Sequence, residues 1–186
     1  KTVLATQFLV DGVERGETGL FVSFEEREES IVENAARLGL DLGDAAFLDL
    51  SPDSEFFDEE RAYDVFGADD LESGSVADRV RTAVKETDPR RVVLDGLTVF
   101  RRLSRDDYQF RATAASLLRY LTDRGATVAF TGGAGRAADD LEFVCDGHLR
   151  LSQAAKGRVL EVTKFRGSNY RSGQHTTRID GDGMTV

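Results

Sequence analysis

The sequence predicts an α/β fold with a mostly parallel sheet, helices on both faces of that sheet, and a group of antiparallel strands towards the C-terminus. Over the first two thirds of the chain, segments with helical periodicity alternate with short, uniformly apolar segments. Strands that are apolar on both faces are typical of a parallel sheet covered by helices. From Gly147 onward the helical periodicity disappears, and strand-like segments separated by turns follow. The chain has 186 residues and no internal repeat, so we expect a single domain over residues 1–186.

Helices and strands are predicted from the spacing of apolar residues and from the glycines that end many of the runs. The helices are expected at residues 1–16, 28–38, 75–85 and 104–124. The strands of the parallel sheet are expected at residues 19–24, 46–50, 91–95 and 126–131. The antiparallel strands are expected at residues 148–152, 159–164 and 176–179. Residues 51–74 are rich in aspartate and glutamate, which predicts a long surface insertion.

The charge of the chain limits the partners that it can bind. The formal net charge is −10, whereas binding along a nucleic acid requires clustered cations. We therefore expect no extended nucleic-acid surface. Most of the cations are arginines, and strong acidity keeps proteins soluble in concentrated salt. This composition is typical of a protein from a salt-loving archaeon, and the alternative is an ordinary acidic bacterial protein.

The apolar segments predict where the protein is located in the cell and whether its single cysteine is buried. No run is long enough for a membrane span and no signal peptide precedes the first helical pattern, so a cytoplasmic protein is expected. Cys145 lies in a short apolar run, which predicts a core thiol without a disulfide partner inside the chain.

Polar side chains stand at the ends of the predicted parallel strands. Glu25 and Glu26 follow one strand, Asp95 ends another, and Thr131 ends the last. Ligands of open parallel sheets bind at the carboxyl ends of the strands, so we expect these residues to line one crevice. The two glutamates alone have two interpretations. Either they open the next helix, where acidic residues suit the helix dipole, or they face a cation or a reactive water.

The first two residues suggest what the crevice binds. Lys1 and Thr2 open a helix, where a phosphate-binding loop of the form G-x-x-x-x-G-K-[ST] would end. An aspartate at the end of an apolar strand, such as Asp95, lies near magnesium in many nucleotide-binding proteins. The glycines of the loop and the strand that leads into it are not in the chain. Because that strand normally lies inside the sheet, we expect residues upstream of Lys1 in the intact protein.

The order and spacing of several motifs match a known family. The motifs are Lys1-Thr2, Phe24-Glu25-Glu26, Asn34-Ala35, Asp49-Leu-Ser-Pro-Asp53, Asp95, Phe143-Val-Cys-Asp146 and Lys164-Phe-Arg166-Gly167. With them the chain resembles the KaiC-like ATPases of the RecA superfamily over nearly its whole length. The resemblance implies a RecA-like P-loop core that binds ATP and Mg²⁺, hydrolyses ATP, and assembles into a homo-oligomer, a hexameric ring. It also implies a role in signalling or regulation, with a signalling protein as partner.

The resemblance implies a role for each matching residue near the crevice. Lys1 would contact the β and γ phosphates of ATP, and Thr2 and Asp95 would hold the magnesium ion. Glu25 would be the general base towards the attacking water, with Glu26 as its acidic neighbour.

Four further residues are implied to act on the nucleotide of the next subunit. Lys164 and Arg166 would reach across the subunit interface in the manner of an arginine finger, a contact that raises rates by about 10³-fold or more. Ser168 and Tyr170 would line the same site, although relatives often have histidine in place of Tyr170. In a monomer, Lys164 and Arg166 would instead be a solvent-facing pair on one side of a strand.

Other functions stay open on the sequence. One is a nucleotide-binding regulatory module that hydrolyses negligibly. Another is a RecA/RadA-type paralogue that acts on single-stranded DNA, although the acidic charge and the lack of a basic, aromatic groove disfavour it. Autokinase activity is not expected, because no serine or threonine lies between Thr131 and Ser152 to accept a phosphoryl group.

Overall fold

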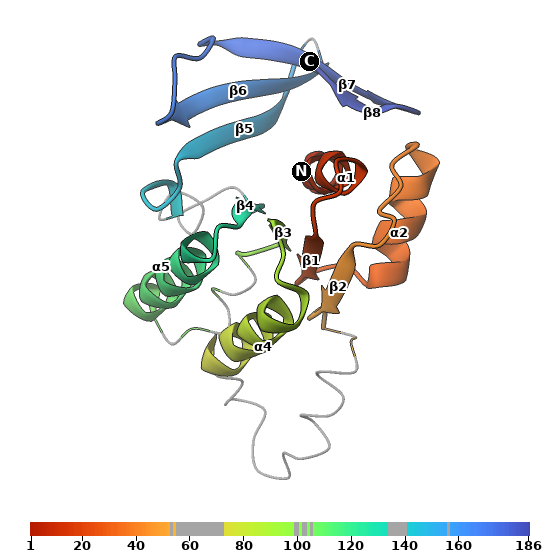
Figure 1. Cartoon of the computed structure of the whole chain (residues 1–186). Coiled ribbons are helices and arrows are strands. Elements are labelled where there is room, and N and C mark those ends of the chain that lie inside the picture. The colour runs from red at the N-terminus through yellow and green to blue at the C-terminus, as the bar shows by residue number, and fades with distance from the viewer. Residues whose placement is uncertain are drawn as a thin grey trace.

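The computed structural model describes most of the chain (Figure 1). The described residues are 1–52, 54, 73–98, 101, 104, 106–133, 141–155 and 157–186. The acidic insertion expected at residues 51–74 therefore lies almost entirely outside the described residues.

A parallel four-stranded sheet forms the centre of the N-terminal part, in the order β2-β1-β3-β4. The strands are β1 (Gly19–Ser23), β2 (Ala46–Asp49), β3 (Arg91–Asp95) and β4 (Thr127–Phe130). β1 pairs with β3 so that Ser23 lies opposite Asp95, which brings their carboxyl ends level. The predicted α/β class with a mostly parallel sheet is thus confirmed.

Helices cover both faces of this sheet, as the apolar strands predicted (Figure 1). One face packs on α4 (Ser73–Thr87) and α5 (Asp107–Asp123), and the other packs on α1 (Thr2–Glu14) and α2 (Glu28–Arg37). Neighbouring residues of β1 divide between the two cores, because successive side chains of a strand point to opposite faces. Leu20 and Val22 join the core of α4 and α5, whereas Phe21 joins that of α1 and α2.

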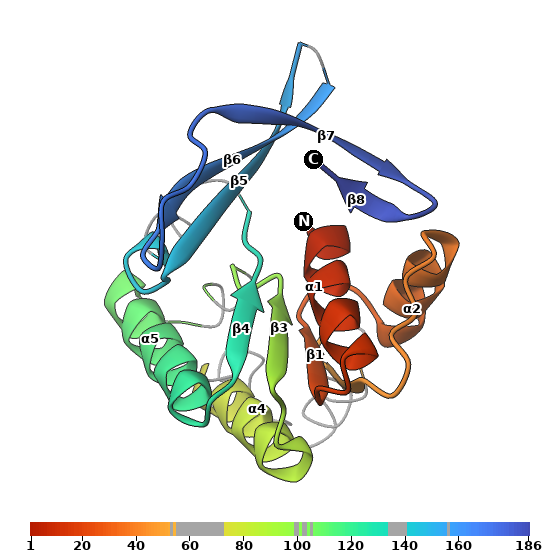
Figure 2. The same ribbon diagram turned by 45° about the horizontal axis from the view of Figure 1, so that its top comes forward.

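The C-terminal part is an antiparallel sheet in the order β5-β6-β7-β8. Its strands are β5 (Gly147–Ala154), β6 (Gly157–Phe165), β7 (Gln174–Asp180) and β8 (Gly183–Thr185). Figure 2 shows β3 and β4 pointing towards this sheet, with the N-terminal end of α1 on the same side. The amide of Met184 donates to Gln7 Oε1 at 2.9 Å and ties β8 to α1.

Element boundaries differ from the predictions at several ends. The longest helix begins at Asp107 rather than at Ser104, because Asp106 caps it by accepting a hydrogen bond from the Gln109 amide at 2.7 Å. α4 begins at Ser73, two residues before the predicted start. The short strand β8 was not predicted. Within the part of the chain that the structure describes, no helix is both long and apolar enough to cross a membrane.

The prediction of a core thiol at Cys145 is wrong. Leu141 reaches the core, but Phe143 is 80% exposed and Cys145 is only partly buried. The cause is a turn at residues 143–144, which directs their apolar side chains outwards. The Cys145 Sγ donates to the carbonyl of Glu142 at 3.3 Å, and burial raises the pKa of the thiol.

Candidate functional site

Asp95 is the centre of a hydrogen-bonded cluster at the carboxyl ends of the parallel strands. It is 3% exposed, and each of its carboxylate oxygens accepts a bond from a hydroxyl group. Thr2 Oγ1 donates to Asp95 Oδ2 at 2.9 Å, and Thr131 Oγ1 donates to Asp95 Oδ1 at 2.5 Å. One carboxylate therefore joins the start of α1 to the end of β4, as the convergence of strand ends predicted.

Glu25 lies directly beside this cluster. A Cβ atom added to Gly96 would lie 2.6 Å from Glu25 Cγ, so the glutamate side chain packs on the backbone of the residue that follows Asp95. Gly96 has a φ of +85°, a conformation that L side chains rarely adopt. The Phe24 amide donates to the Asp95 carbonyl at 2.9 Å and holds the end of β1 in this position.

Glu26 lies in a fixed turn before α2 and not in the helix itself. The Ser23 hydroxyl donates to the Glu26 carbonyl at 2.5 Å, and the Glu26 amide lies 3.2 Å from the same hydroxyl. The acidic first turn of α2 consists of Glu28 and Glu29. Burial, with Glu29 and Asp49 nearby, raises the pKa of Glu28. Glu25 and Glu26 therefore do not form the acidic first turn of the helix, and the second interpretation of the pair stays a prediction.

Lys1 and a groove between two helices lie at the same end of the sheet as Asp95. Lys1 Nζ donates to the carbonyl of Gly132, which follows Thr131 after the end of β4. A groove of about 330 Å³ lies between α1 and α2, and Thr2 and Glu26 line it together with apolar side chains. Thr2 therefore stands between the Asp95 cluster and this groove.

Lys164 of β6 and Arg166, which directly follows β6, bind a different segment of the chain. Lys164 Nζ donates to the Glu142 carbonyl at 2.5 Å. Arg166 donates to Asp146 Oδ1 at 3.3 Å and to the Phe143 carbonyl at 3.4 Å. Among the described residues, neither side chain is bonded to Thr2, Asp95 or Glu25. Within the described part of one chain, this pair is bonded to residues 142–146 and not to the Asp95 cluster.

Ser168 and Tyr170 lie in the exposed segment between β6 and β7. The Ser168 hydroxyl donates to the neighbouring Asn169 carbonyl at 3.1 Å. The Tyr170 hydroxyl donates to the Thr163 carbonyl at 3.3 Å, so the ring folds back towards β6. Both residues belong to the same part of the molecule as Lys164 and Arg166.

Comparison with known proteins assigns the chain to a family. A family model described as "ATPase: KaiC" matches residues 1–186. The chain belongs to the KaiC ATPase family. It is 31% identical to the circadian clock protein KaiC3 of Synechocystis sp., over 204 aligned residues that include 100% of this chain and 39% of the relative. It is also 31% identical to the circadian clock oscillator protein KaiC of Synechococcus elongatus, covering 100% of this chain and 38% of that protein.

This KaiC-family chain spans well under half of the length of those relatives. The match confirms the KaiC-like resemblance found in the sequence, and a RecA-like P-loop domain is consistent with it. The predicted origin in a salt-loving archaeon stays a prediction.

The residues of this KaiC-family chain suit a nucleotide with magnesium. The amides of the first turn of α1 precede the first intrahelical bond, from Ala5 N to the Lys1 carbonyl at 3.1 Å, so this helix start can donate to phosphate. Thr2 and Asp95 supply a hydroxyl and a carboxylate oxygen, which are the hard ligands that Mg²⁺ takes. Mg²⁺ usually binds through one or two such ligands plus phosphate oxygens, so this small donor set is sufficient.

Two residues of this KaiC-family site were not assigned a role from the sequence. Thr131 was placed at the crevice, but its bonds to Asp95 and to the Gly96 amide, the latter at 2.9 Å, depend on the pairing of distant strands. Gly96 supports Glu25, and the only signal for it was a glycine directly after a strand-ending aspartate.

Proposed function

We propose that this chain is the nucleotide-binding core of an ATP-hydrolysing, Mg²⁺-dependent subunit. The observation that carries the proposal is the bond between Thr2 Oγ1 and Asp95 Oδ2 at 2.9 Å, which joins a helix start to a buried strand-end carboxylate. With Glu25 packed beside Asp95, a phosphate-binding end and a carboxylate base share one edge of the sheet.

Each residue of the cluster has one role in the proposed reaction. Lys1 binds the β and γ phosphates, and Thr2 and Asp95 hold the magnesium ion. Glu25 accepts the proton of the attacking water, and Glu26 keeps the neighbouring turn acidic. The ion supplies positive charge that neutralises the developing charge of the phosphoryl group. The protein contributes chiefly position, because phosphoryl transfer leaves little covalent chemistry to the side chains.

Lys164 and Arg166 act on the nucleotide of a neighbouring copy in a ring, with Ser168 and Tyr170 beside them. Their hydrogen bonds within the chain hold them on residues 141–146, away from the Asp95 cluster of the same subunit. We infer that this pair serves another subunit, since a rotationally symmetric ring places one surface of each copy against a different surface of the next. The nucleotide state of such a ring would alter its contacts with a signalling partner.

A nucleotide-binding module that does not hydrolyse ATP is the second candidate. The observation that favours it is that Lys164 and Arg166 bond to residues 142–146 of their own chain and not to the Asp95 cluster. Without an assembled ring, ATP would bind and persist.

Single-turnover hydrolysis by the full-length protein separates the two candidates. Glu25→Gln removes the base while keeping the size of the side chain, and we expect the rate to fall by about 10²-fold or more with ATP still bound. Glu29→Gln is the matched control, because Glu29 is an exposed glutamate in the first turn of α2. Equal, near-zero rates in the wild type and in Glu25→Gln would leave only the binding module.

A further inference from the structure

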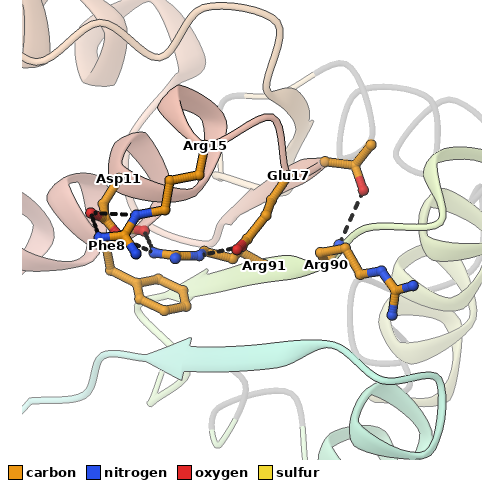
Figure 3. Close-up of polar contacts among 7 residues, drawn as sticks. Phe8, Asp11, Arg15, Glu17, Arg90 and Arg91 are labelled. Carbon is orange, nitrogen blue, oxygen red and sulfur yellow. Dashed lines mark hydrogen bonds and ion pairs between the residues drawn. The ribbon is translucent and has the colours of Figure 1, made fainter.

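Arg91, the first residue of β3, holds the middle of α1 and the segment that follows this helix through several polar bonds (Figure 3). Its Nε donates to Glu17 Oε2 at 2.6 Å. Its Nη1 donates to Asp11 Oδ2 and to the Phe8 carbonyl, both at 2.7 Å. The guanidinium also lies over the Phe8 ring, 5.0 Å from its centre, and the side chain is only 14% exposed.

α1 is therefore attached to β3 at two places. Thr2 bonds to Asp95 at the carboxyl end of the strand, and Asp11 bonds to Arg91 at the other end. Asp11 lies nine positions after Thr2, a rise of about 13 Å along a helix at 1.5 Å per residue. Asp95 lies four positions after Arg91, a rise of about 13 Å along a strand at 3.3 Å per residue. The helix and the strand run antiparallel with matching lengths between their two attachments.

The Arg91 side chain packs closely against α1 at Gly12. A Cβ atom added to Gly12 would lie 2.4 Å from Arg91 Cδ and 2.5 Å from Arg91 Nε. The side chain thus crosses α1 at the one position that carries no side chain of its own. A movement of α1 along or about its axis would therefore require the Arg91 side chain to move as well.

The apolar contacts of α1 do not fix its position as closely. Ala5, Leu9 and Val10 pack on the sheet, and such contacts are non-directional. Directional hydrogen bonds fix the final position of the helix more closely than apolar contacts do. A misplacement of reacting groups by about 1 Å can lower a reaction rate about 10²-fold. The distance between Thr2 and Asp95 therefore depends on what holds the far end of the helix.

We propose that Arg91 is a positioning residue of the nucleotide site, which sets the place of α1 on β3 and thereby the Thr2–Asp95 geometry that receives magnesium. This inference rests on the proposed function, because it assigns a task to a residue that touches neither nucleotide nor metal.

The test measures ATP binding by the full-length protein as a function of Mg²⁺ concentration. Arg91→Met removes the polar bonds and keeps an unbranched apolar side chain. Gly12→Ala displaces Arg91 and leaves every charge in place, and in most helices this change is stabilising. For both variants we expect the Mg²⁺ concentration that gives half of the maximal increase in ATP binding to rise about tenfold. The ATP affinity measured without Mg²⁺ should change by less than about twofold. Arg15→Ala is the control, because Arg15 bonds to the same Asp11 from an exposed position.

An unchanged Mg²⁺ requirement in folded Gly12→Ala or Arg91→Met protein would overturn the proposal. If Arg91→Met does not fold, Gly12→Ala alone decides. If the wild type binds no ATP, the proposed function fails, and hydrogen exchange at the hydrogen-bonded amides of α1 from Ala5 onward then tests Arg91 separately. Faster exchange there in both variants, but not in Arg15→Ala, supports the positioning role, and unchanged exchange refutes it.

Discussion

At the scale of single residues, the site depends on hydroxyl groups that orient one carboxylate. Asp95 has a hydroxyl donor on each oxygen, from Thr2 and from Thr131. The sequence placed Asp95 and Thr131 at the same edge, because strand ends of a parallel sheet converge, and it placed Thr2 there through the phosphate-loop pattern at the start of the first helix. It did not reveal that Thr131 also accepts from the Gly96 amide, since that bond joins residues 35 positions apart.

Thr131→Val should destabilise the fold and disturb the site. The change keeps the shape of the side chain but leaves Asp95 Oδ1 and the Gly96 amide without their hydroxyl partner, which costs about 1–3 kcal/mol for a buried group. Urea unfolding measures the loss. Thr131→Ser restores the hydroxyl and should recover most of the stability; equal losses in both variants would show that the methyl group matters instead.

At the scale of the elements, apolar patterning predicted the layers well and the polar connections poorly. Uniformly apolar β1 divides between two cores as expected for a covered parallel sheet. β8 has only three residues, too few to show an alternation, and the apolar run at 143–145 resembled a core segment although a turn exposes it. The attachment of α1 by Arg91 was invisible, because its partners lie about 80 positions away in the chain.

This attachment should weaken in acid. Hydrogen bonds from Arg91 and Arg15, the two cations that face Asp11, lower the pKa of that carboxyl group. A lowered pKa in the folded state gives stability that is fully present above the unfolded value, near pH 3.9, and is lost as the pH falls through the folded value. Asp11→Asn should therefore reduce the free energy of unfolding at pH 6 and have less effect at pH 3. Urea titrations at both pH values measure this, and an effect of the same size at both would contradict it.

At the scale of the whole molecule, the two sheets hold the two parts of the proposed active site. Asp95 ends β3 of the parallel sheet, with Thr2 of α1 bonded to it and Glu25 just after β1, whereas Lys164 lies in β6 of the antiparallel sheet and Arg166 directly follows it. The sequence motifs suggested both parts, and the structure adds that they are not bonded to each other within one described chain. We therefore expect hydrolysis only where two copies meet.

Mixing two inactive variants tests this claim most directly. Glu25→Gln subunits lack the base, and Arg166→Ala subunits lack a cation for the neighbour's site. In randomly mixed full-length rings, an intact Glu25 faces an intact Arg166 at about one interface in four. We predict that the equimolar mixture regains about a quarter of the wild-type hydrolysis rate although each variant alone is inactive. No recovery in mixed rings, or full activity of a monomer, would contradict the account.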